Sequence, residues 1–227
     1  MSHKNKAKGN MYPFVDATWN PIRGRCPHKC SYCYMARFWE TDEFNTPPRM
    51  IEESFKTKFG EGERIFVGSS IDIFAEEIPA EWIRRVLDFC SKAPKAAFLF
   101  QTKNPDRFKD FKIQKNFMIA ATIETNIYSR KAMGEAPAPA LRAVAMQDIQ
   151  HKAKMVSIEP VMKFNEEIMI DWITKIEPVF VSIGADSKGH GLPEPTAEEV
   201  ESLIARIEAA GIEVVRKDNL TRITEGK

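Results

Sequence analysis

The chain has 227 residues, 43% of them hydrophobic, which suits one α/β domain with a sizeable core. Its 33 basic and 32 acidic side chains leave a net charge of +1. That balance argues against binding nucleic acid through bulk charge, although a local basic patch stays open. No apolar run reaches the ~18 residues of a membrane span, so no membrane partner is expected.

Residues 1–10 are polar and basic and lack the apolar stretch of a secretory signal. We expect a flexible leader over 1–10 and a single domain over 11–227, because no low-complexity linker divides the chain. Reduced cysteines point to a cytoplasmic protein.

Short apolar runs alternate with helical patterns along the chain. The runs predict strands at 14–18, 65–68, 96–100, 117–122, 155–158, 179–183 and 212–215. The helical patterns lie at 31–40, 80–91, 105–111, 139–150, 165–175 and 196–209. This alternation predicts a parallel α/β sheet that is covered by helices.

The last helix has clear end signals. Thr196 and Glu199 have the spacing of a capping box, in which each side chain bonds the other's backbone. Gly211 is the expected C′ glycine.

Three of the four cysteines lie in one short loop after the first strand, at Cys26, Cys30 and Cys33. Thiolates from one loop can hold three corners of a [4Fe–4S] cluster and leave the fourth iron open. Zinc with His28 is an alternative, but structural zinc sites usually take ligand pairs from separate segments. A disulfide would leave one of the three thiols over. Cys90, in a helical pattern, is expected to be a buried, inert thiol.

The strand ends are polar although the strands are apolar. In a parallel α/β barrel, the loops after the carboxyl ends of the strands carry the chemistry. The segments at these ends are the cysteine loop, 68–72, 101–103, 122–126, 159, 184–190 and 216–219. We therefore expect these segments to meet at one rim.

The cysteine spacing, with Tyr32 before the last cysteine, resembles the signature of the radical S-adenosylmethionine (SAM) superfamily. Segments 18–22, 66–74 and 101–103 are similar to the small phage Gp37/Gp68-like (DUF5131-type) group. The resemblance implies a partial (β/α)6 barrel with an additional C-terminal strand, and a [4Fe–4S] cluster on the three cysteines. SAM would bind the open iron and be cleaved to methionine and a 5′-deoxyadenosyl radical, with a flavodoxin or ferredoxin as electron donor.

The resemblance also assigns cofactor contacts. The expected SAM contacts are Tyr32 and Ile158 at the adenine, Gly68, Ser69 and Ser70 at the amino group, Lys103 at the carboxylate, and Thr122 or Glu124 at the ribose. The family's Gly-Gly-Glu-like segment is here Gly-Ser-Ser, so its acid is missing and that contact would rest on carbonyls and hydroxyls.

The remaining rim residues are the expected substrate ligands: Asp72, Glu159, Asp186 and Asn219. Several carboxylates with few rim cations indicate a small molecule that offers hydrogen-bond donors. The specific hypothesis is a lyase acting on the 7-deazaguanine base queuine, with nucleic acid an unlikely partner. The alternatives are a radical SAM enzyme acting on nucleic acid and a non-catalytic metal-binding module that contacts it. His190 is expected in a lid or on the surface, and Trp19 in packing.

Overall fold

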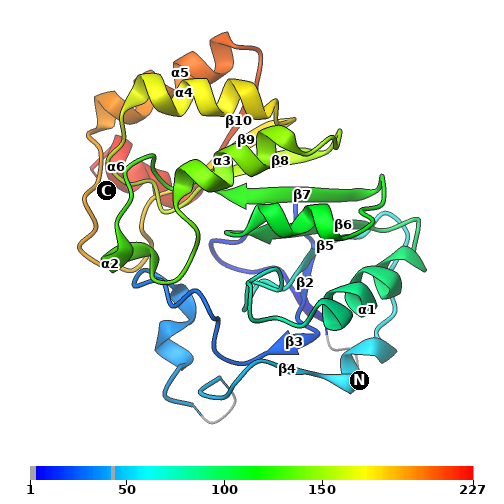
Figure 1. The fold of residues 1–227 in the computed structure, drawn as a ribbon. Coiled ribbons are helices and arrows are strands. Elements are labelled where there is room, and N and C mark those ends of the chain that lie inside the picture. The colour runs from blue at the N-terminus through cyan, green and yellow to red at the C-terminus, as the bar shows by residue number, and fades with distance from the viewer. Residues whose placement is uncertain (1–3, 42–43, 227) are drawn as a thin grey trace.

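The computed structural model describes residues 4–41 and 44–226 and contains an eight-stranded sheet (Figure 1). Its strand order is β1-β2-β5-β6-β7-β8-β9-β10. The parallel strands are β2 (Ala17–Trp19), β5 (Arg64–Val67), β6 (Ala97–Thr102), β7 (Phe117–Thr122), β8 (Lys154–Ile158), β9 (Phe180–Ile183) and β10 (Glu213–Arg216). Within the described ranges β1 and β10 are the two edges, so the barrel is open. The predicted partial barrel with an additional C-terminal strand is confirmed.

Helices follow most of the parallel strands. The α-helices are α1 (Ala80–Ser91), α2 (Arg130–Met133), α3 (Pro139–Asp148), α4 (Glu166–Ile176), α5 (Ala197–Ala209) and α6 (Thr221–Thr224). The prediction for α1 is confirmed at both ends. The capping box of Thr196 and Glu199 is present, and Gly211 has φ +80°, as a C′ glycine requires. None of the described helices is both long and apolar enough to cross a bilayer.

Two predicted helices are instead 3-10 segments. The 3-10 segments are η1 (Tyr34–Phe38), η2 (Glu52–Lys56), η3 (Pro105–Asp110) and η4 (Asp218–Leu220). The predictions at 31–40 and 105–111 are thus wrong in helix type. In the first, Cys33 N donates to Cys30 O and Ala36 N to Cys33 O, the i to i+3 pattern of tight turns.

The N-terminal segment belongs to the sheet. Strand β1 (Lys4–Lys6) pairs antiparallel with β2, so a flexible leader does not describe residues 4–6. The strand predicted at 14–18 begins later, because Val15 N closes a turn onto Tyr12 O. Tyr12 and Val15 then pack on the inner face of the sheet with Leu99 and Met155.

Side chains alternate between the two faces of the sheet, so the buried residues form a separate core on each face. Alternate residues such as Val156 and Ile158 face the helices, in one large apolar core with Trp19 and Cys90. Trp19 stacks on Phe89 with ring centroids 5.2 Å apart, which confirms its packing role. Cys90 is fully buried on α1, as expected of an inert thiol. A separate small hairpin, β3 (Ile22–Arg23) with β4 (Arg49–Met50), flanks the cysteine loop in sequence.

Candidate active site

A cavity of about 550 Å³ lies at the carboxyl ends of the parallel strands. In Figure 1 the arrowhead of β7 points toward this side, where α2 also lies. The cavity is lined by the cysteine loop and by residues from 68–72, 101–103, 122, 157–160, 185–190 and 217. The prediction that the polar strand ends meet at one rim is therefore confirmed by the fold.

All three loop cysteines are free and line this cavity. Burial raises the pKa of each thiol, and that of Cys26 reaches about 12, so without a metal the thiols stay protonated. No three His, Cys, Asp or Glu side chains among the described residues converge on a single ion. A cluster needs no such convergence, because each thiolate binds a different iron. The donor set therefore fits a [4Fe–4S] cluster better than one zinc ion.

Asp72 ties the cysteine loop to two strand ends. Its Oδ2 lies 2.8 Å from Nε2 of buried His28 and accepts from Thr102 Oγ1 at 2.9 Å and Lys103 N at 2.7 Å. Its Oδ1 accepts from Phe74 N at 3.0 Å. Burial would raise the pKa of Asp72, but attraction to His28 and these hydrogen bonds hold it below its ordinary value. Asp72 lines the cavity as expected, but the protein already uses its carboxylate to hold Nε2 of His28.

Helix α2 supports the cysteine loop from the other side. Ser31 N donates to Ala132 O at 2.9 Å, and Glu135 N donates to His28 O at 2.7 Å. The approach is so close that a Cβ on Gly134 would lie 2.1 Å from His28 O. Only glycine fits here, since Gly134 also has φ +60° and ψ −126°.

Tyr32 is held by a buried ion pair. Its Oη donates to Glu124 Oε1, and Glu124 Oε2 accepts from Arg142 Nη1 at 2.7 Å. Burial would raise the pKa of Glu124, but the charges of Arg142 and Lys103 and the hydrogen bond from Tyr32 together lower it. Glu124 is fully buried and does not line the cavity. The expectation that it binds ribose is corrected: it positions Tyr32, which does line the cavity.

The turn at Gly68, Ser69 and Ser70 lines the cavity as expected. Asn20 holds it, since Asn20 Oδ1 accepts from Ser70 N at 3.0 Å. Tyr34 Oη donates to Ser69 O at 2.7 Å. The Ser70 hydroxyl is buried and has no hydrogen-bond partner among the described residues.

Lys103 and Thr122 also line the cavity, whereas Ile158 does not. Lys103 Nζ lies 5.3 Å from the centre of the Tyr32 ring. Ile158 is fully buried under the helices, so its expected adenine contact is corrected. Its neighbour Ser157 faces the cavity instead, because side chains alternate along a strand.

The far end of the cavity contains residues that the sequence analysis missed. Lys217 Nζ donates to Glu159 Oε2 at 2.8 Å and also to Asn10 O. Asn10 Nδ2 donates to Glu159 Oε1 at 3.0 Å. Asn219 Nδ2 donates chiefly to Ala185 O at 2.6 Å, and Asn219 does not line the cavity itself. Asn10 belongs to the segment that was expected to be a flexible leader, so nothing in the sequence pattern indicated its contacts with Lys217 and Glu159.

Asp186 is also occupied by its own loop. Its Oδ1 lies 2.7 Å from His190 Nδ1 and accepts from Lys188 N at 3.0 Å. Burial would raise the pKa of Asp186, but these hydrogen bonds lower it. His190 lines the cavity from this loop.

The charge of the rim differs from the expectation. Its carboxylates are Asp72, Glu159 and Asp186, and each is bonded within the protein. The basic side chains that line the cavity are Lys8, Lys29, Arg37, Lys103, Lys188 and Lys217. The expectation of few rim cations is therefore wrong, because cations from the N-terminal segment and the cysteine loop reach the same mouth.

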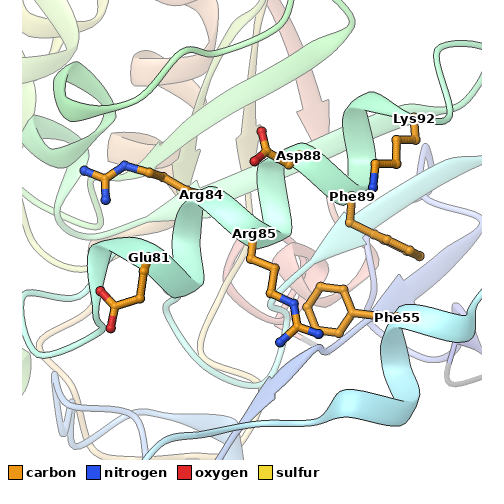
Figure 2. A pocket seen from close by; sticks show the side chains of 7 residues that line it. All are labelled: Phe55, Glu81, Arg84, Arg85, Asp88, Phe89 and Lys92. Atoms are coloured by element: carbon orange, nitrogen blue, oxygen red, sulfur yellow. The ribbon is translucent and has the colours of Figure 1, made fainter.

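A second hollow, of about 540 Å³, lies between α1 and η2, and it shares no lining residue with the first cavity (Figure 2). The Arg85 guanidinium lies 4.2 Å from the centre of the Phe55 ring and pairs with Glu52. No cysteine is among the residues that line this second hollow.

Known structures share the fold at low sequence identity. A Cys-to-Ser mutant of spore photoproduct lyase matches with a TM-score of 0.66 at 12% identity, over 92% of this chain and 78% of that one. A Cys-to-Ala mutant with dinucleoside spore photoproduct gives the same values. A double mutant with bound AdoMet and that dinucleoside matches at 0.57 and 13% identity, over 88% and 63%.

No curated protein matches the sequence. The family model described as "Protein of unknown function (DUF5131)" matches residues 10–217, which is nearly the whole chain. The chain therefore belongs to the DUF5131 family.

Proposed function

We propose that this protein is a radical SAM enzyme of the lyase type. The observation that carries the proposal is the meeting of three free thiols from one loop with the Gly68–Ser70 turn and Lys103 in a single cavity. A [4Fe–4S] cluster on Cys26, Cys30 and Cys33 would supply the electron for reductive cleavage of SAM. The fold shared with spore photoproduct lyase, one structure of which holds AdoMet, supports this proposal.

The protein's own part is to hold SAM and keep water out. Lys103 Nζ makes no hydrogen bond with the described residues, so it is available to the SAM carboxylate. The unpartnered Ser70 hydroxyl is available to a donor such as the SAM amino group. Tyr32 and Thr122 offer a ring face and a hydroxyl to the nucleoside part.

The charge of the rim changes which of the candidate substrates is favoured. A deazaguanine base was favoured because the rim carboxylates were expected to be free, and they are bonded within the protein. The size of the cavity still suits one base. The basic mouth favours the second candidate, a lyase or modification reaction on nucleic acid. The flavodoxin or ferredoxin donor stays a prediction.

The test is SAM cleavage by the anaerobically reconstituted chain with dithionite. We expect 5′-deoxyadenosine and methionine in equal amounts, and none from C30A. Iron-loaded protein that forms no 5′-deoxyadenosine, with or without added oligonucleotide, would overturn the proposal.

A further inference from the structure

We propose that a single nucleic-acid strand lies across the mouth of the cavity, with its phosphates at Lys8, Lys29, Arg37 and Lys188. We call these four side chains the mouth cations. The inference rests on the proposed function for the reaction, and it adds the substrate class and the surface that binds it.

The mouth cations are exposed, line one cavity and come from three separate segments. None of them makes an ion pair with a described residue. Elsewhere about half of the exposed cations are paired with a carboxylate, as in Arg64–Asp16, Arg85–Glu52, Lys95–Glu61, Arg216–Glu201 and Arg222–Glu194. The net charge of +1 therefore hides a local excess of positive charge at the mouth.

Each described carboxylate that lines the cavity is bonded within the protein. Asp72 and Asp186 are used by backbone and histidine donors, and Glu159 is paired with Lys217. The basic side chains that line the cavity outnumber these three carboxylates, so the mouth as a whole attracts phosphates.

Size and aromatic content favour a strand over a small phosphate compound or a duplex. A cavity of about 550 Å³ takes one small ligand, so with SAM bound most of a polymer must stay outside. A base inside a duplex cannot reach such a site unless it leaves the stack. Tyr34, 44% exposed at the same cavity, offers a ring on which an unpaired base can stack.

The experiment measures fluorescence anisotropy of the anaerobically reconstituted chain with labelled single strands of about 12 nucleotides, in DNA and RNA forms. A duplex of the same sequence, thymidine monophosphate and inorganic phosphate serve as competitors. The variants are K8Q/K188Q, which leaves the cysteine loop untouched, and K29Q/R37Q. The matched control is R84Q/K92Q, which removes the same charge from exposed cations on α1 and at its C-cap (Figure 2).

We expect the affinity of wild type to fall with salt with a slope of about −3 for four phosphate contacts to a single strand. Each mouth variant should reduce the slope by about 1.4 and weaken binding at least about fivefold at low salt. The control should stay within about twofold of wild type. The duplex and the two small phosphates should compete poorly.

Three results would overturn the inference. These are no binding by wild type, an equal loss in the control, and competition by thymidine monophosphate as strong as that of the strand. If K29Q/R37Q loses iron, K8Q/K188Q alone decides. SAM cleavage by wild type is measured in a separate assay. If the protein binds the strand but forms no 5′-deoxyadenosine, only the proposed function is contradicted. If the protein forms 5′-deoxyadenosine but does not bind the strand, only this inference is contradicted.

Discussion

Arg142 Nη1 lies 2.7 Å from Glu124 Oε2, and neither side chain has exposed surface. The other carboxylate oxygen of Glu124 accepts from Tyr32, so this pair joins α3 to the cysteine loop. Arg142 also donates to Thr122 O at 3.0 Å and to Pro137 O at 2.6 Å. The network fixes the position of an aromatic ring that lines the cavity.

R142M should lower the free energy of unfolding by about 3–5 kcal/mol, because it leaves the Glu124 charge buried without its partner. R142M/E124M should recover part of this loss, since no uncompensated charge then remains. Urea unfolding of wild type, R142M, E124M and the double variant gives the coupling energy of the pair. A loss below about 1 kcal/mol in R142M would contradict the buried pair.

G134A should be costly and should reduce iron loading. An alanine Cβ would lie 2.1 Å from the carbonyl oxygen of His28, so α2 and the cysteine loop must move apart. G211A is the control, because Gly211 also has positive φ but no atom within 4 Å of a Cβ. We expect G211A to cost about 1 kcal/mol and to keep its iron. Equal thermal shifts and equal iron contents in the two variants would count against the close packing of α2 on the loop.

D72N should destabilise the fold by about 2–3 kcal/mol and lower iron loading, because an amide oxygen accepts the His28 and backbone donors more weakly. D186N is the matched control. Asp186 also lines the cavity, but it bonds only Lys188 and His190 of its own loop. Iron content after reconstitution separates the two, and loss of iron in D186N as large as in D72N would be the contrary outcome.

C26A, C30A and C33A should each lose most of the iron, whereas C90A should keep it. Cys90 is fully buried in the helix-side core, where its substitution costs packing alone. Colorimetric iron and sulfide analysis checks this. An iron-replete single variant of a loop cysteine would argue that another group binds the metal.

Many of the helices and strands could be predicted from the sequence because local signals agreed with the fold. The helical pattern of α1 and the capping box of α5 are local signals, and the structure has both as predicted. The strands could be located but not oriented, because strands buried on both faces show no alternation. The resemblance alone therefore assigned Ile158 to the adenine, and no alternation in the strand indicated that Ser157 faces the cavity instead.

The partners within the site were beyond sequence reasoning. Glu124 is a rim residue by its position in the sequence, and only the packing of α3 shows that Arg142 takes its carboxylate. Lys217 meets Asn10 across nearly the whole chain. Such contacts depend on how the sheet curves, which local pattern does not encode.

The most direct test of the central claim is an EPR spectrum of the anaerobically reconstituted, dithionite-reduced chain with and without SAM. A [4Fe–4S]⁺ signal that changes when SAM is added is the predicted result, since three cysteines leave one iron for that ligand. A cluster signal indifferent to SAM, or a colourless protein with stoichiometric zinc, would contradict it.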